Sequence, residues 1–276
     1  MMKEKTGGDI LDVWQRETDL TTSDVYGQYL LDGGVRGLVS LVKLEEAFEK
    51  VMREVKETRV DGVPAVWSLY NMGYIVKTRE ALFSIDLVHR RAQEFAPLLD
   101  FALVTHNHGD HCHMELYKAM NSAGKTVVSN FLDNYGAKDW RKHGGFTRGR
   151  KVFRIKDVEI RTSLVDHNSY LLDFTTAFEI RVGGWIGYHT GDCGVADKLG
   201  TVWGRPDLWM FFPGCGVDVA EAVRKVVPRR VVFGHLWELA HRTGRLTAPL
   251  IRRALNAAAT AGCDDVAVRF WGEKIL

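Results

Sequence analysis

Four potential metal ligands fall within six residues of this chain, and no requirement of core packing explains their density. They are His106, His108, Asp110 and His111. The segment directly follows the apolar run 101–104, which predicts a buried strand. Side chains alternate in direction along an extended chain, so His106 and His108 are expected to point to the same side. Gly109 lets the backbone turn and present Asp110 and His111 beside them. The segment is therefore interpreted as a loop that can serve two adjacent metal ions.

Length and composition indicate a globular protein. The chain has 276 residues, of which 46% are hydrophobic and 26% are charged. Such a chain can bury a large core and is most simply one domain, or one domain with a small extension. No apolar run approaches the roughly 18 residues of a membrane span, and no apolar segment follows the basic residues at the start as in a signal peptide. We therefore expect a soluble, cytoplasmic protein that does not interact with a membrane.

Cysteine spacing and net charge argue against disulfide-rich, zinc-ribbon and nucleic-acid-binding proteins. The four cysteines lack CxxC spacing, which indicates reduced thiols rather than a disulfide framework or a structural zinc ribbon. They are Cys112, Cys193, Cys215 and Cys263. A net charge of +2 gives little support for binding to nucleic acid.

Hydrophobic periodicity changes along the chain. Residues 1–37 show no clear period, but apolar residues recur at steps of three and four from Leu41 to Val55 and predict an amphipathic helix. The helix would pack on the body of the domain; a dimer contact or a wall of the substrate pocket are alternatives. We expect residues 1–60 to form an extension packed on a main domain of residues 61–276.

Residues after 64 read as two groups of strands, each followed by helices. Segments 65–70, 74–77 and 81–86 predict an antiparallel meander. Further strands are predicted at 101–105, 126–129, 158–167, 208–212, 231–235 and 266–270, a hairpin at 175–182 and 185–190, and helices near 114–120, 219–227 and 248–261.

The spacing HxHxDH after a buried strand resembles the signature of the metallo-β-lactamase superfamily. Members of that family carry further ligands far downstream, at the ends of later strands. Here His167, Asp192 and His235 stand at those places, each after an apolar run. The resemblance extends from about Trp67 to Phe270. It implies an α/β (α+β) fold, the four-layer αββα sandwich of two mixed β-sheets with external helices.

The resemblance also implies a ligand set. His106, His108 and His167 would bind a first metal, Asp110, His111 and His235 a second, and Asp192 would bridge both. This donor mixture suits two Zn²⁺ ions, and Mn²⁺ or Fe²⁺ also accept it. Diiron oxidoreductases of the superfamily usually have glutamate at the position of His108, which argues against that branch.

Several neighbouring residues are candidates for supporting roles. The family carries an aspartate at the position of Asp86 that positions the histidine loop; alternatively, Asp86 caps a helix over residues 87–96. Four more residues lie close to ligands in sequence and would either orient imidazoles and line the pocket or simply pack: His189, Asn168, Tyr170 and Trp237. Cys112 and Cys193 directly follow proposed ligands, and Cys193 is an alternative ligand to Asp192. The spacing of the remaining histidines does not recommend them: His89, His113, His143 and His241.

The implied activity is hydrolysis by a metal-bridging hydroxide, with Asp110 passing the proton to the leaving group. The residues around His167 and before Asp192 resemble the ascorbate-6-phosphate lactonase-like branch. A lactone or a related carboxylic ester or amide is therefore the first choice of small-molecule substrate. The basic segment 141–151 would hold an anionic group of it or form a solvated loop. A phosphodiesterase acting on a nucleotide or nucleic acid and a non-catalytic binding module are the alternatives, and a homo-oligomer is possible.

Overall fold

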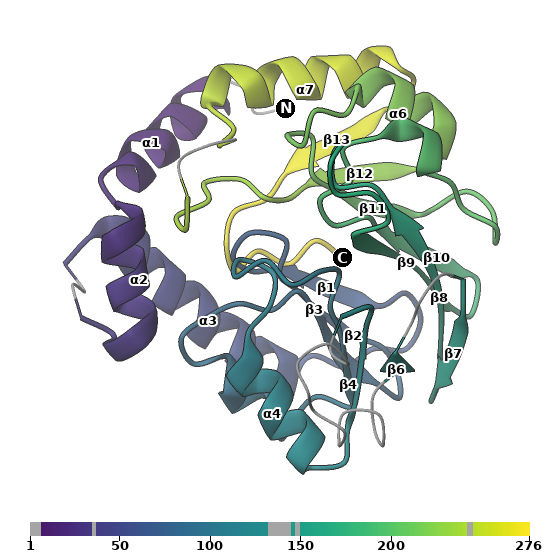
Figure 1. The fold of residues 1–276 in the computed structure, drawn as a ribbon, viewed down its shortest axis with the longest axis horizontal. Helices are drawn as coiled ribbons and strands as arrows, with labels where there is room; N and C mark the ends of the chain where they lie inside the picture. The colour runs from purple at the N-terminus through teal and green to yellow at the C-terminus, as the bar shows by residue number, and fades with distance from the viewer. Residues whose placement is uncertain (1–6, 35–36, 132–144, 147–149, 242–244) are drawn as a thin grey trace.

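Two β-sheets lie face to face, with helices on their outer sides (Figure 1). The computed structural model describes residues 7–34, 37–131, 145–146, 150–241 and 245–276. Helices α3 (Val39–Glu57) and α4 (Met114–Ser122) lie on one side, and α6 (Val219–Val226) and α7 (Ala248–Thr260) on the other. The predicted αββα sandwich of two mixed sheets is confirmed.

The first sheet has its strands in chain order. They are β1 (Ala65–Ser68), β2 (Tyr74–Lys77), β3 (Leu82–Ile85), β4 (Phe101–Leu103), β5 (Thr126–Ser129) and β6 (Gly145–Phe146). Strands β1 to β3 pair antiparallel, as the predicted meander requires, and β4 then lies parallel between β3 and β5. Because β4 is central and fully buried, the histidine loop leaves the sheet from a firmly held strand end.

The second sheet runs in the order β13-β12-β11-β10-β9-β8-β7. Its strands are β7 (Val152–Ile155), β8 (Val158–Val165), β9 (Thr175–Val182), β10 (Trp185–His189), β11 (Leu208–Phe211), β12 (Arg230–Phe233) and β13 (Asp265–Val268). The predicted hairpin joins β9 to β10, and Gly183 at its turn has a φ of 57°, a left-handed conformation that glycine adopts without strain. β8 and β10 both run antiparallel to β9, while β10, β11 and β12 are parallel. The carboxyl ends of β8, β10 and β12 therefore lie at the same edge.

Alternate residues of each strand serve different apolar layers. Val66 of β1 belongs to the cluster between the sheets, whereas the neighbouring Trp67 belongs to the cluster beneath the helices. Trp67 also donates its indole N–H to Glu54 of α3 at 2.8 Å. Since both faces are covered, strands such as β4 and β11 read as continuous apolar runs.

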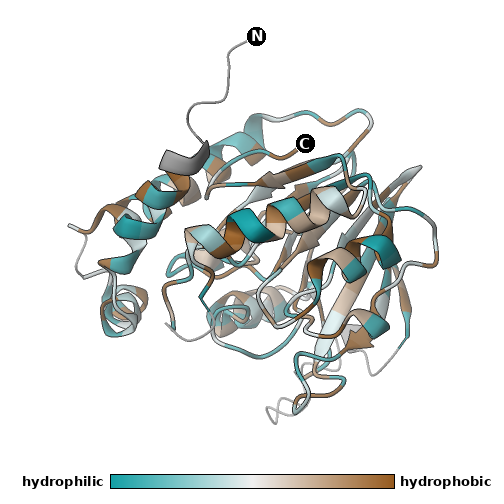
Figure 2. Cartoon of the chain, turned by 90° about the horizontal axis from the view of Figure 1, so that it is seen from above, coloured by the Kyte–Doolittle hydropathy of each residue, from teal (hydrophilic) through white to brown (hydrophobic). Residues whose placement is uncertain are grey.

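The outer helices are amphipathic, with hydrophobic and hydrophilic residues interspersed along each helix (Figure 2). The apolar stripe predicted for residues 41–55 is buried in α3, at Leu41, Leu44, Phe48, Val51 and Val55. The helix considered for residues 87–96 is wrong: only a 3₁₀ turn at Ala92–Phe95 forms. Just before that turn, the ring of His89 accepts the Arg91 N–H at 3.1 Å, a local bond that competes with helix formation. In the described residues, no helix is long and apolar enough to cross a membrane.

The amino-terminal residues, where no period was evident, form two helices, α1 (Gly7–Asp19) and α2 (Ser23–Asp32). Helix α1 contacts both α3 and α7, and so connects the two outer layers (Figure 1). Its Trp14 packs against Trp237 and Trp271 with ring centroids 5.1 Å away in each case. The division into an extension of residues 1–60 and a main domain stays a prediction, but these contacts place the amino-terminal helices firmly on the sandwich.

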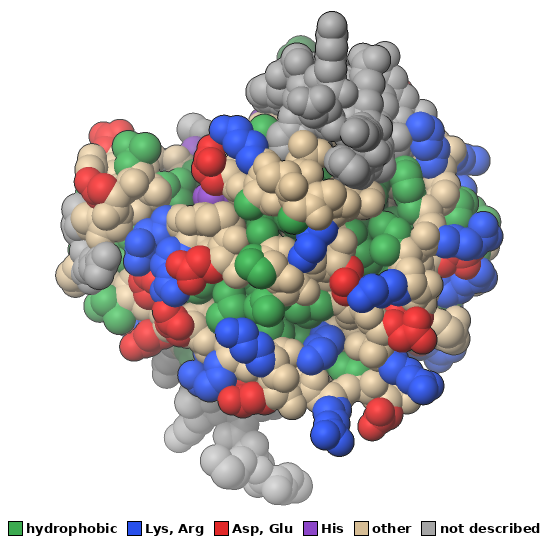
Figure 3. Space-filling view, turned by 90° about the horizontal axis from the view of Figure 1, so that it is seen from below, with side chains coloured by type: hydrophobic (Ala, Val, Ile, Leu, Met, Phe, Trp, Pro, Cys, Tyr) green, Lys and Arg blue, Asp and Glu red, His purple; other side chains and the backbone are tan. Residues whose placement is uncertain are grey.

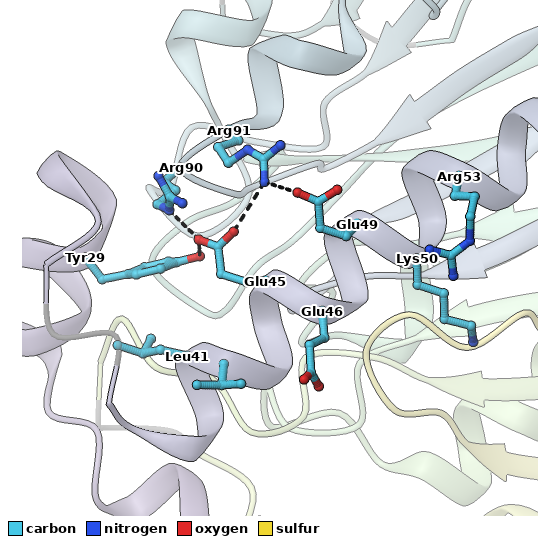
Figure 4. Close-up of a pocket in the computed structure, with 10 residues that line it drawn as sticks. Tyr29, Leu41, Glu45, Glu46, Glu49, Lys50, Arg53, Arg90 and Arg91 are labelled. Atoms are coloured by element: carbon cyan, nitrogen blue, oxygen red, sulfur yellow. Dashed lines mark hydrogen bonds and ion pairs between the residues drawn. The ribbon is translucent and has the colours of Figure 1, made fainter.

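His89 is buried where α2 meets α3. Its ring stacks on Phe48 at 4.1 Å, and its Nε2 lies 3.0 Å from the Tyr29 hydroxyl. Burial lowers the pKa of His89 to about 3. The same face carries a groove of about 530 Å³, in which Glu45 binds Tyr29, Arg90 and Arg91 (Figure 4). The predicted metal ligands do not line this groove.

Acid should destabilise the protein through His89. Its folded-state pKa of about 3 lies below the ordinary value of 6.5, so the unfolded chain binds an extra proton between these pH values. Stability therefore falls as the pH drops through this window, by up to about 1.4 kcal/mol per pH unit. Urea unfolding between pH 7 and pH 4, with a chelator present throughout, measures this slope. His89→Gln should be less stable at pH 7 but should lose less stability on acidification; equal slopes would contradict the assignment.

Candidate metal centre

All seven predicted ligands come together at one edge of the sandwich. They lie on the loops that follow β4, β8, β10 and β12. Their donor atoms form overlapping groups of three in which all atoms lie within 4.8 Å of one another: His106, His108 and His167; His106, His111 and Asp192; and Asp110, His111 and His235.

The first set is made of three imidazoles. Nε2 of His106 lies 3.1 Å from Nδ1 of His108, and the ring of His167 is 4.9 Å from that of His108. His106 is fully buried, whereas His108 and His167 are partly exposed. Phe174 packs against all three rings at 5.1 to 6.0 Å.

The second set surrounds one carboxylate oxygen. Oδ2 of Asp110 lies 3.0 Å from Nε2 of His235 and 3.5 Å from Nε2 of His111. All three side chains are buried. The ring of Phe212 stacks on His235 with centroids 4.0 Å apart.

Asp192 lies between the two sets. Its Oδ1 is 3.2 Å from Nε2 of His111, and its Oδ2 is 3.4 Å from Nε2 of His235 and 3.6 Å from Nε2 of His167. One carboxylate therefore faces donors of both sets.

The donor atoms fit two divalent cations. Nε2 of His167, Nε2 of His235 and Oδ1 of Asp192 are buried and make no hydrogen bond. Buried polar atoms that lack hydrogen bonds are costly, and cations bound between these histidines and the Asp192 carboxylate would satisfy them. Imidazole nitrogen and carboxylate oxygen together suit Zn²⁺, Mn²⁺ or Fe²⁺.

The ionisation of the cluster points the same way. Burial opposes charge on His111, but the carboxylates of Asp192 and Asp110 raise its pKa well above the usual value. For His235, burial is likewise outweighed by Asp192 and Asp110, which raise its pKa to about 9. Burial alone would raise the pKa of Asp192, yet His111 and His235 hold it well below the usual range. Protons on His111 and His235 thus compensate the negative charge of the buried carboxylates. Bound cations could provide the same compensation in their place.

The sequence and the structure of the chain were compared with those of known proteins. No family model matches the chain. A UPF0173 metal-dependent hydrolase of Caldivirga maquilingensis is 29% identical, over 59% of this chain and 82% of that protein. Among solved structures, the metallo-β-lactamase fold protein YhfI from Bacillus subtilis superposes with a TM-score of 0.56 at 13% identity, covering 78% of this chain and all (100%) of YhfI. The chain has the metallo-β-lactamase fold. Its sequence is similar to those of UPF0173 metal-dependent hydrolases.

Another solved structure with this fold has a different chemistry. CmlA, a diiron β-hydroxylase from Streptomyces venezuelae, superposes with a TM-score of 0.55 at 14% identity, over 78% of this chain and 54% of CmlA. The fold alone therefore does not determine the metal or the reaction.

In this metallo-β-lactamase-fold protein, Asp86 ties the histidine loop to the first sheet. Its Oδ1 accepts the Thr105 N–H at 2.7 Å, and its Oδ2 accepts the Thr105 hydroxyl at 2.6 Å and lies 2.8 Å from Nδ1 of His111. Asp86 is fully buried and has a φ of 43°, which is unusual for a non-glycine residue. The carboxylate thus orients His111 so that its Nε2 faces the cluster, and it does not cap a helix.

His189 supports the turn that carries Asp192. Its Nδ1 accepts the Gly191 N–H at 3.2 Å, and its Nε2 lies 3.1 Å from the Met72 carbonyl oxygen. Gly191 has a φ of 50°, and a Cβ there would lie 2.8 Å from Thr105 and Thr175. Only glycine fits this close approach of the Asp192 turn to the histidine loop.

Three residues near the centre were missed by the sequence reasoning. Asn71, in the turn between β1 and β2, donates to Oδ2 of Asp110 at 2.9 Å. The Sγ of Cys215 lies 3.5 Å from Nδ1 of His167. His241 reaches to 3.6 Å from Oδ2 of Asp110, although its spacing had not recommended it.

The remaining residues that the sequence suggested for supporting roles differ in their contacts. Asn168 has its Nδ2 3.3 Å from Nδ1 of His167, whereas Tyr170 is 91% exposed. Trp237 packs on Phe270 at 5.0 Å. Cys112 contacts Met114, and Cys193 donates to the Val195 carbonyl oxygen. Most of the basic segment 141–151, with His143, lies outside the described residues.

Removing the Asp86 carboxylate should loosen the metal site. Asp86→Asn loses the acceptor that orients His111, so affinity for divalent cations should fall by about 10- to 100-fold. Competition with a chelating dye measures it. Asp197→Asn, which changes a carboxylate that is 86% exposed, is the matched control and should bind as the wild type does. Unchanged affinity in Asp86→Asn would refute the orienting role.

Metal binding should release protons. The pKa of His235 is about 9 and that of His111 is also raised, so both are largely protonated at neutral pH and must lose these protons to bind a cation. Apparent affinity should therefore rise with pH up to about 9, by as much as about tenfold per unit for each proton released. Titration in weakly buffered solution with a pH indicator detects the release; pH-independent binding would contradict this ionisation.

Proposed function

We propose that this chain is a metal-dependent hydrolase that acts on a lactone or a related carboxylic ester or amide of a small molecule. The observation that carries the proposal is the convergence of seven donor side chains in two sets joined by Asp192. The homology to a UPF0173 metal-dependent hydrolase supports the reaction class. The resemblance around His167 and Asp192 to lactonase-like proteins supports the substrate class.

Each donor has a role in this proposal. His106, His108 and His167 would hold one cation, Asp110, His111 and His235 the other, and Asp192 would contact both. Two divalent cations held there would lower the pKa of a water molecule toward about 7, supply the nucleophile and polarise the substrate carbonyl. Zn²⁺ is proposed first because three neutral imidazoles with a carboxylate are a typical zinc environment.

Asp110 would carry the proton. Burial would raise its pKa, but His111 and His235 lower it far below the usual range, so the carboxylate is ionised. The amide of Asn71 donates to its Oδ2 and holds it in place. As the water oxygen bonds to the carbonyl carbon, the Asp110 carboxylate would take the water proton; as the ester C–O bond breaks, it would pass that proton to the leaving oxygen.

The surroundings favour an organic substrate. Phe174 and Phe212 place apolar rings against the two histidine sets. Lys198, on the neighbouring loop, is already paired with Asp166 at 2.7 Å and with Asp173 at 2.5 Å. A neutral carbonyl compound matches these walls better than a strongly solvated phosphodiester.

A phosphodiesterase acting on nucleic acid has less support. On the face shown in Figure 3, Lys and Arg side chains are interspersed with Asp and Glu side chains. Tracking a nucleic-acid backbone requires clustered cations.

A substrate panel tests the proposal. Protein reconstituted with Zn²⁺ should hydrolyse simple lactones or aryl esters faster than a bis-nitrophenyl phosphodiester, and chelation should abolish turnover. Asp192→Asn should lose activity by at least about 100-fold, because both cations lose a ligand. Asp197→Asn should keep it. Full turnover in metal-free protein would overturn the metal-dependent reaction, and a preference for the phosphodiester would overturn the substrate class.

A further inference from the structure

His241 lies at the metal centre although it is not one of the seven predicted ligands. Its Nε2 is 3.6 Å from Oδ2 of Asp110, comparable to the 3.5 Å between Nε2 of His111 and the same oxygen. Its side chain is 48% exposed, so it lies at the open side of the cluster. The ring of His235 is 6.2 Å away.

The backbone between His235 and His241 is unusually bent. His235 and Trp237 both have left-handed conformations, with φ of 57° and 56°. Such conformations are unfavourable for bulky residues and persist only where the surrounding structure imposes them. Here the two bends let one short segment bring two histidines to the same carboxylate.

Glu238 holds His241 in place. It is 1% exposed, and its Oε2 accepts the His241 backbone N–H at 2.9 Å and lies 3.2 Å from Nδ1 of the His241 ring. Its Oε1 accepts the Tyr70 hydroxyl at 2.8 Å and the Ala240 N–H. These contacts occupy the lone pairs of the carboxylate. Glu238 is therefore an anchor for His241 and not itself a free ligand.

The amino-terminal helices brace this anchor. Tyr26 of α2 packs on Tyr70 with ring centroids 5.2 Å apart, and Trp14 of α1 packs on Trp237 at 5.1 Å. The segment that carries Glu238 and His241 is thus held between the first sheet and the extension.

We propose that His241 is a further ligand, through Nε2, of the cation held by Asp110, His111 and His235. Oδ2 of Asp110 has the Nε2 atoms of His235, His111 and His241 at 3.0, 3.5 and 3.6 Å. Ligand atoms of one cation at about 2.0–2.2 Å lie at most about 4.4 Å apart, and each of these nitrogen atoms meets that limit with Oδ2 of Asp110. His241 also forms a potential metal-binding group with Asp110 and Glu238. A buried carboxylate that holds Nδ1 while Nε2 faces the metal is the usual support of a ligating histidine. With Asp192, this cation would have five protein ligands.

This inference rests on the proposed metal centre. A titration with cobalt distinguishes failure of the inference about His241 from failure of the metal centre itself. Metal-free protein is titrated with Co²⁺, and its visible absorption is recorded together with affinity by chelator competition. The wild type should bind two ions. His241→Ala should weaken one of them by at least about tenfold and change its absorption, and should leave the other unchanged. Glu238→Gln should shift the same ion in the same direction by a smaller factor.

His113→Asn is the matched control. It removes an imidazole that caps α4, where the ring accepts the Leu116 N–H, and asparagine can also cap a helix. This variant should match the wild type in both affinities and in absorption. If His241→Ala and Glu238→Gln also match the wild type, His241 is not a ligand and the inference is overturned. If the wild type itself binds no cobalt, the proposed metal-dependent function fails instead.

Discussion

Two buried carboxylates, Asp110 and Asp192, determine how the functional edge of this protein is built. Burying a charged carboxylate is costly unless an opposite charge compensates it. Around these two lie the nitrogen atoms of His111, His167 and His235, at distances from 3.0 to 3.6 Å. The compensation can come from protons on the imidazoles or from divalent cations. This balance leads to the proposal that the cluster is a site where two cations would replace protons.

The sandwich makes such a cluster possible because strands from both sheets end at one edge. The first sheet supplies the histidine loop, held by Asp86, and the second supplies His167, Asp192 and His235 from three strand ends. Apolar residues on both sides of each sheet fix the strands, so the ligands project from rigid elements rather than from a long flexible loop. The amino-terminal helices extend this support to the segment that carries Glu238 and His241.

Much of this organisation was predictable from the sequence. Most of the strands, the hairpin at Gly183 and the helix α3 follow from periodicity, but the strands β6 and β7 were not predicted. The density of ligands after β4 indicated the centre. Helices α1 and α2 were missed because they rely on contacts such as that of Trp14 with Trp237, which join residues remote in sequence. His241 and Asn71 were missed for a related reason: two left-handed residues redirect the chain after β12, and a turn residue reaches across to Asp110. Local sequence patterns do not predict such contacts between distant residues.

A crystal structure of the protein grown with Zn²⁺, with anomalous scattering recorded at the zinc absorption edge, would locate the bound cations. We expect two peaks about 3.5–4 Å apart on either side of Asp192. One should lie among His106, His108 and His167, and the other among Asp110, His111 and His235. A single peak at this edge of the sandwich, or none at saturating zinc, would contradict the dinuclear centre.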